Sequence, residues 1–104
     1  MSDNLKPEDE FIAFLEVHPE FYPLSQSTFY IDFLKTMSTQ AKTIGQFSQL
    51  FPKIEQKDLE LIVFSLQKLK LISRAVVGEQ KFYYISHIGK EFLEKYVKAK
   101  ESLA

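Results

Sequence analysis

Residues 56–90, QKDLELIVFSLQKLKLISRAVVGEQKFYYISHIGK, decide the fold of this 104-residue chain. From Gln56 to Lys70, apolar residues recur every three or four positions, which predicts an amphipathic helix. Two runs rich in β-branched and aromatic residues follow, Ile72–Val77 and Lys81–Ser86, joined by a short connection that contains Gly78. The stretch therefore predicts a helix followed by a two-stranded hairpin.

A final helix is expected after the hairpin, from His87 to about Ala99, with a frayed tail from Lys100. Ser86 precedes this helix and can cap it. The apolar stripe of the helix consists of Ile88, Phe92, Leu93, Tyr96 and Val97.

Upstream of residue 56 the capping signals predict three more helices. Thr43 and Gln46 have capping-box spacing, so a short helix is expected from Thr43 to the stop at Pro52. Ser25 or Ser27 can cap a helix that continues to about Ser38. Residues 7–18 form the first predicted helix, because a proline at its start and three acids after it suit a helix N-terminus. Residues 19–24 are expected to be a connector.

The order short helix, turn, longer helix, hairpin, helix resembles a winged helix-turn-helix domain. Leu66–Ile72 is similar to the Leu-x-x-Leu-Gly-Leu-Ile segment that joins the recognition helix to the wing in MarR-like, PadR-like and related archaeal and bacterial regulators. Tyr84–Lys90 is similar to the Leu-Thr-x-x-Gly-Lys/Arg segment that enters the closing helix. The resemblance covers roughly residues 28–100. It departs at Lys70, where the family has a glycine suited to a left-handed helix cap.

This resemblance implies a mainly α fold with a small β-hairpin (α+β), with five helices and a two-stranded wing. We expect one domain over residues 1–104. It comprises an N-terminal helical extension (7–38), a winged-helix core (39–86) and a C-terminal helix (87–100).

Charge is unevenly distributed along the chain, although the whole chain carries a formal net charge of only -1. Residues 1–36 sum to -5, residues 37–64 to 0 and residues 65–104 to +4. The total excludes a strongly basic nucleic-acid coat but leaves room for a local basic patch.

The resemblance implies that the helix at 56–70 enters the major groove of DNA and that the hairpin contacts the flanking DNA backbone. Phosphates attract Lys and Arg, while bases are contacted by Arg, Lys, Asn and Gln. The DNA-binding candidates are therefore Lys42, Thr43, Lys53, Gln56 and Lys57 from the helices, and Arg74, Gln80 and Lys81 from the hairpin. The implied function is a transcriptional regulator that binds double-stranded DNA.

Several residues favour an alternative, a winged-helix protein–protein interaction module that does not bind DNA specifically. Arg74 is the only arginine, and three acids lie near the start of the recognition helix. Leu61 and Phe64 widen the apolar face of that helix, and core packing is the plain explanation for both. A protein partner could contact the same helix or the acidic N-terminal region.

Homodimerisation is expected, because two apolar helices lie outside the compact motif. Their aromatic side chains are the candidates for a dimer seam: Phe29, Tyr30, Phe33, Phe92 and Tyr96.

Residues typical of enzymes and metal sites are scarce. The chain has no cysteine, its two histidines are far apart, and its three glycines are scattered rather than gathered in a phosphate-binding loop. We therefore expect no enzyme activity, metal or cofactor. The polar N-terminus and the lack of a long apolar run predict a soluble cytoplasmic protein with no membrane partner.

Overall fold

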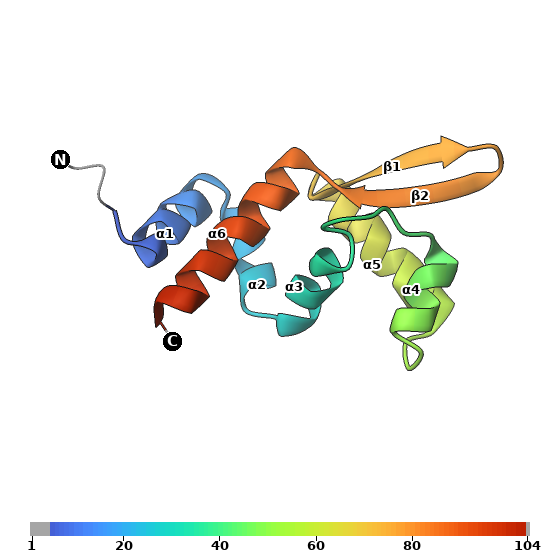
Figure 1. The fold of residues 1–104 in the computed structure, drawn as a ribbon, viewed down its shortest axis with the longest axis horizontal. Helices are drawn as coiled ribbons and strands as arrows, with labels where there is room; N and C mark the ends of the chain where they lie inside the picture. The colour runs from blue at the N-terminus through green and yellow to red at the C-terminus, as the bar shows by residue number, and fades with distance from the viewer. Residues whose placement is uncertain (1–4, 104) are drawn as a thin grey trace.

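Helices and one antiparallel hairpin make up the computed structural model, which describes residues 5–103 (Figure 1). The elements are α1 (Pro7–Val17), the 3-10 helix η1 (Pro19–Phe21), α2 (Tyr22–Ser25), α3 (Thr28–Lys35), α4 (Ile44–Leu50), α5 (Gln56–Lys68), β1 (Ile72–Val77), β2 (Gln80–Ile85) and α6 (His87–Leu103). The predicted fold class is confirmed, with six α-helices instead of five in the described part. None of the helices within residues 5–103 is long and apolar enough to cross a membrane.

The additional helix arises where the sequence predicted a connector, at residues 19–24. Pro19 and Pro23 each occupy one of the first two positions of a short helix, where a proline ring costs no backbone hydrogen bond. Phe21 and Leu24 on these helices are buried. Both prolines therefore lie at the start of short helices, in the stretch that was expected to be a connector.

The capping box predicted at α4 is present. The Gln46 backbone N–H donates to Thr43 Oγ1 at 3.2 Å, and the Thr43 backbone N–H donates to Gln46 Oε1 at 2.8 Å. Ser27 occupies the N-cap position of α3, but its side chain makes no capping hydrogen bond. Of these two caps, only the one with a Gln partner three residues on makes side-chain bonds.

Helix α5 ends in a left-handed turn at Lys70, the position where the resembled family has glycine. The backbone φ of Lys70 is 66°, the one positive value at a non-glycine residue in the described chain. Its N–H donates to Gln67 O at 2.9 Å, and the Leu71 N–H donates to Leu66 O at 3.0 Å. These two bonds form a Schellman motif, in which a Cβ is a steric cost.

Replacing Lys70 with glycine is therefore expected to raise the free energy of unfolding by about 0.5–1 kcal/mol, because it removes that cost. Chemical denaturation followed by circular dichroism measures the change. Lys68→Gly, two residues earlier and still helical, should instead lower stability by about 1 kcal/mol. A Lys70→Gly protein less stable than the wild type would contradict the account.

The hairpin extends from the helices as a long ribbon (Figure 1). Its strands pair from Ile72 opposite Ile85 to Val77 opposite Gln80. Gly78 begins the two-residue turn with φ of 64°, a conformation that glycine adopts without strain. A further bridge joins the ribbon to the segment just before α4, where the backbones of Lys42 and Tyr83 exchange two hydrogen bonds of 2.8 Å.

Ser86 connects the hairpin, the end of α5 and the start of α6. Its Oγ accepts from the Gly89 N–H at 3.0 Å, as predicted for a cap, and donates to Lys70 O at 2.6 Å. Its backbone N–H donates to Leu71 O at 2.9 Å. Because Gly89 lacks a side chain, α6 approaches this carbonyl closely: a Cβ at Gly89 would lie 2.1 Å from Leu71 O.

Helix α6 continues to Leu103, so the frayed tail predicted from Lys100 is wrong. Its C-terminal part packs along α1 (Figure 1), and Ser102 Oγ lies 3.3 Å from Glu8 Oε2. This contact between distant parts of the chain supports the last turn.

Two aromatic clusters form much of the core. Rings from α1, η1 and α6 make the first: Phe11, Phe14, Phe21, Phe92 and Tyr96. In the second, the Phe33 ring stacks on the rings of Phe47 and Phe51, with distances between ring centroids of 4.5 Å and 5.4 Å.

Most of the predicted dimer seam lies inside these clusters. Phe33 and Phe92 are 0% exposed and Tyr96 is 7% exposed. Their rings pack against residues of the same chain, so they offer no surface to a second copy, and their assignment to a seam is wrong. Phe29 and Tyr30 are partly exposed at the edge of the second cluster.

Candidate nucleic-acid interface

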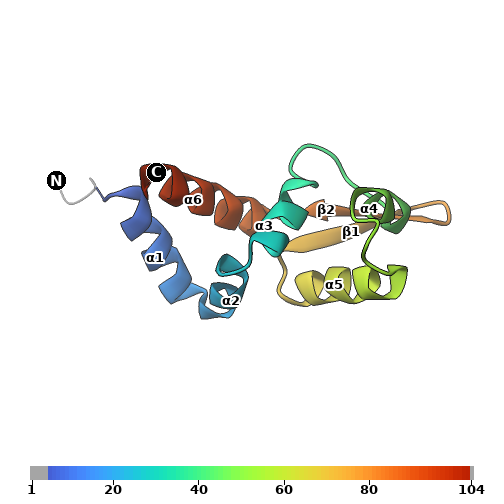
Figure 2. The same ribbon diagram turned by 90° about the horizontal axis from the view of Figure 1, so that it is seen from below.

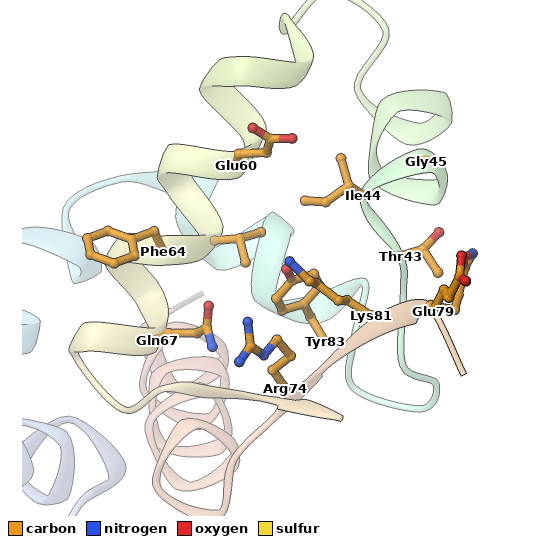
Figure 3. Close-up of a pocket in the computed structure, with 12 residues that line it drawn as sticks. Thr43, Ile44, Gly45, Glu60, Phe64, Gln67, Arg74, Glu79, Lys81 and Tyr83 are labelled. Carbon is orange, nitrogen blue, oxygen red and sulfur yellow. The ribbon is translucent and has the colours of Figure 1, made fainter. Parts of the chain in front are cut away.

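An open groove of about 560 Å³ lies between α5, the start of α4 and the hairpin (Figure 3). Its walls combine hydrogen-bonding side chains with charges of both signs. The polar lining residues are Thr43, Glu60, Gln67, Arg74, Glu79, Gln80, Lys81 and Tyr83. Ile44, Val63 and Phe64 supply apolar surface.

Strand register explains why Arg74 and Lys81 belong to this groove. Arg74 pairs with Tyr83, and Lys81 is two residues before Tyr83 on the same strand, so all three share one face of the hairpin. Tyr83 is buried and lines the groove together with Val63 of α5. The two exposed cations therefore flank a ring that is packed against the helices.

Of the eight predicted DNA-binding residues, four line the groove: Thr43, Arg74, Gln80 and Lys81. Lys42 is next to them, through its backbone bridge to Tyr83. The other three are exposed and do not line the groove: Lys53 lies in the turn before α5, and Gln56 and Lys57 lie at the start of α5. Gln56 Nε2 lies 3.3 Å from Glu60 Oε2, within hydrogen-bonding distance.

Gln67 is a groove residue that the sequence analysis missed. In Figure 3 its amide and the Arg74 guanidinium point toward each other. It follows Glu60 by seven residues, two helical turns, so both lie on the same side of α5. The seven-residue spacing from Glu60 could have predicted that Gln67 lies on the groove side of the helix.

The outermost face of α5 carries Lys57, Leu61, Phe64 and Lys68, spaced at i, i+4, i+7 and i+11; we call this the α5 stripe. It lies opposite the buried residues Leu59, Val63 and Leu66. Leu61 is 59% exposed and Phe64 57% exposed, so the explanation of this pair as core residues is wrong. Lys68 Nζ lies 5.6 Å from the centroid of the Phe64 ring, within range of a cation–π contact.

Positive and negative side chains occupy different positions around α5 and the groove. The stripe itself has a lysine at each end and no acid between them, whereas Asp58 and Glu60 border it on its two sides. Arg74 and Lys81 add positive charge from the hairpin, with Glu79 beside them. An anion would therefore find cations along the stripe and the ribbon, and acids between them.

In comparisons with known proteins, no protein-family model matches the sequence, and no curated protein matches it significantly.

Proposed function

We propose that the chain is a cytoplasmic DNA-binding transcriptional regulator of the winged helix-turn-helix class, resembling the MarR-like and PadR-like proteins. The observation that carries the proposal is the placement of cations from three segments around one helix. Lys42 precedes α4, Lys57 and Lys68 lie on α5, and Arg74 and Lys81 lie on the hairpin. Phosphate contacts from such segments orient a duplex, and base contacts then give specificity.

Side chains suited to base contacts lie between these cations. The Gln67 amide lies at the groove and can pair with an adenine edge. The exposed Phe64 ring can contact thymine methyl groups, which are the apolar feature of the major groove. We therefore expect α5 to occupy the major groove and the hairpin to lie along the adjacent backbone.

Titration of a labelled mixed-sequence duplex, followed by fluorescence anisotropy, tests the proposal. We expect binding near micromolar at low salt that weakens as salt is raised, because bound cations displace counterions from the phosphates. Absence of salt-sensitive binding near micromolar would contradict it.

Leu61 and Phe64 favour a second candidate, a winged-helix protein-interaction module. Exposed large apolar side chains on one helix face are a feature of protein-binding surfaces. This candidate predicts that the α5 stripe binds protein and that no duplex binding depends on it. The same titration separates the two candidates.

A further inference from the structure

Strand β1 forms the open edge of the hairpin. Within residues 5–103 the sheet contains only β1 and β2, and the segment at Lys42 bonds to the other side of β2 at Tyr83. Figure 1 shows β1 as the outermost strand, and the tip of the ribbon extends beyond α4 and α5 in both Figure 1 and Figure 2. One edge of the ribbon is therefore attached to the domain, and the other, along β1, is open.

The hydrogen bonds of Tyr83 determine which backbone groups face the open edge. In an antiparallel pair, the N–H and C=O of one residue point to the same side, and successive residues alternate. The N–H and C=O of Tyr83 both bond to Lys42, so they point away from β1. Arg74 is paired with Tyr83, so its N–H and C=O point away from β2. By alternation Val76 also presents both groups to the open edge, and neither residue has a further backbone bond within residues 5–103.

This edge has few of the features that normally prevent strand pairing. Proteins protect edge strands with prolines, bulges or several charges. Strand β1 has no proline, its pairing with β2 continues without a bulge from Ile72 to Val77, and Arg74 is its single charge. Val76 is 57% exposed and Val77 66% exposed. A β-branched strand with open N–H and C=O groups is a template on which another strand can pair.

The charged side chains around this edge are mostly basic. Residues 65–81 carry four bases and one acid, all exposed: Lys68, Lys70, Arg74, Lys81 and Glu79. Three of the bases lie in the first half of β1 or before it, whereas Glu79 lies in the turn at its other end. Of the two acids on α5, Asp58 is in the first turn, remote from the start of β1, and Glu60 lies across the groove from Arg74 (Figure 3). The charges therefore favour acidic residues beside the first half of β1.

We propose that β1 binds an extended acidic segment of a partner protein, which adds to the hairpin as a further strand. Antiparallel pairing, the more stable arrangement, places the first residues of that segment beside Val76 and Val77 and its later residues beside Arg74 and Lys70. The segment would therefore carry β-branched residues first and acids after them. Backbone bonds supply the affinity, and the charges favour this segment over others.

The open edge of β1 is separate from the α5 stripe, and the proposal does not depend on DNA binding. Arg74 serves both proposals, so a bound segment and a duplex would compete for its side chain. Binding of the segment is measured without DNA, and its failure is therefore distinct from failure of the DNA-binding proposal.

A labelled peptide in which alternating valines and threonines precede several glutamates is the probe, and its fluorescence anisotropy measures binding to the full chain. Amide hydrogen exchange followed by NMR then locates the bound peptide. The Arg74 and Val76 amides should exchange rapidly in the protein alone and at least about tenfold more slowly with saturating peptide, because only the peptide bonds to them. The Ser73 and Ala75 amides, which point toward β2, are the internal control and should be protected in both states.

Val76→Pro removes the outward N–H of Val76 but none of the bonds to β2, because proline is tolerated in a strand where its nitrogen faces an open edge. This variant should bind the peptide at least about tenfold more weakly than the wild type. Val76→Thr is the matched control, because it keeps the N–H and a β-branched side chain, and its affinity should stay within about twofold. Protection of the Ala75 amide checks that each variant retains the hairpin.

A second peptide, with lysines in place of the glutamates, should bind more weakly than the acidic one. The proposal would be overturned by no binding of the acidic peptide at submillimolar concentration, or by a bound peptide that leaves the Arg74 and Val76 amides unprotected. Equal affinity of the lysine peptide, or of the Val76→Pro protein, would also overturn it. Slow exchange of these amides in the protein alone, increasing with protein concentration, would place a second copy at the edge instead and would contradict the proposal as well.

Discussion

Gly89→Ala is expected to lower the free energy of unfolding by about 3 kcal/mol, a large effect for the addition of one methyl group. The new Cβ would lie 2.1 Å from Leu71 O and 2.8 Å from Ile85 Cγ1. The first neighbour is backbone, and it already accepts the Ser86 N–H. Helix α6 would have to move away from the hairpin, and this movement would break the hydrogen bonds that Ser86 makes with Lys70, Leu71 and Gly89.

Gly45→Ala is the matched control, because Gly45 is also helical but its Cβ would meet only Thr43 Oγ1, at 3.7 Å. Alanine is the better helix former, so Gly45→Ala should leave stability unchanged or raise it by up to about 1 kcal/mol. Thermal unfolding of both variants measures the difference. Equal stability of the Gly89→Ala protein and the wild type would show that α6 does not approach Leu71 as closely as described.

The triple variant Lys57→Glu, Arg74→Glu and Lys81→Glu is expected to bind duplex DNA at least about 100-fold more weakly than the wild type. These residues come from α5 and from both strands of the hairpin. All three are exposed, so the substitutions remove cations and add acids without disturbing the core. Anisotropy titration at low salt gives both affinities.

Lys90→Glu with Lys98→Glu is the control for this loss, because both lysines are exposed on α6, away from the groove. This pair lowers the net charge but should change the affinity much less than the triple variant does. If both variants lose affinity to the same extent, binding follows net charge and the proposed site is wrong.

Features encoded by neighbouring residues could be predicted from the sequence. The Thr43 capping box, the hairpin and the Ser86 cap each depend on residue types a few positions apart. The prolines of residues 19–24 were harder to interpret, because proline ends one helix and can begin the next. Here the burial of Phe21 and Leu24 stabilises the two short helices that begin with these prolines.

Exposure of side chains depends on contacts between distant elements, and for this reason some predictions of exposure and burial from the sequence were wrong. Periodicity placed Leu61 and Phe64 on one edge of a helix, but it could not reveal that no other element within residues 5–103 covers that edge. The opposite error occurred for Phe33 and Phe92, which pack in the core rather than at a seam. Apolar pattern gives the relative directions of side chains on a helix; tertiary packing decides which of them are covered.

The salt dependence of wild-type binding to one labelled duplex is the most direct test of the proposed DNA-binding function. With about four phosphate contacts, raising salt from about 50 to about 150 mM should weaken micromolar binding by roughly 50-fold. No detectable binding at the lower salt concentration, or an affinity that does not change with salt, would contradict the account.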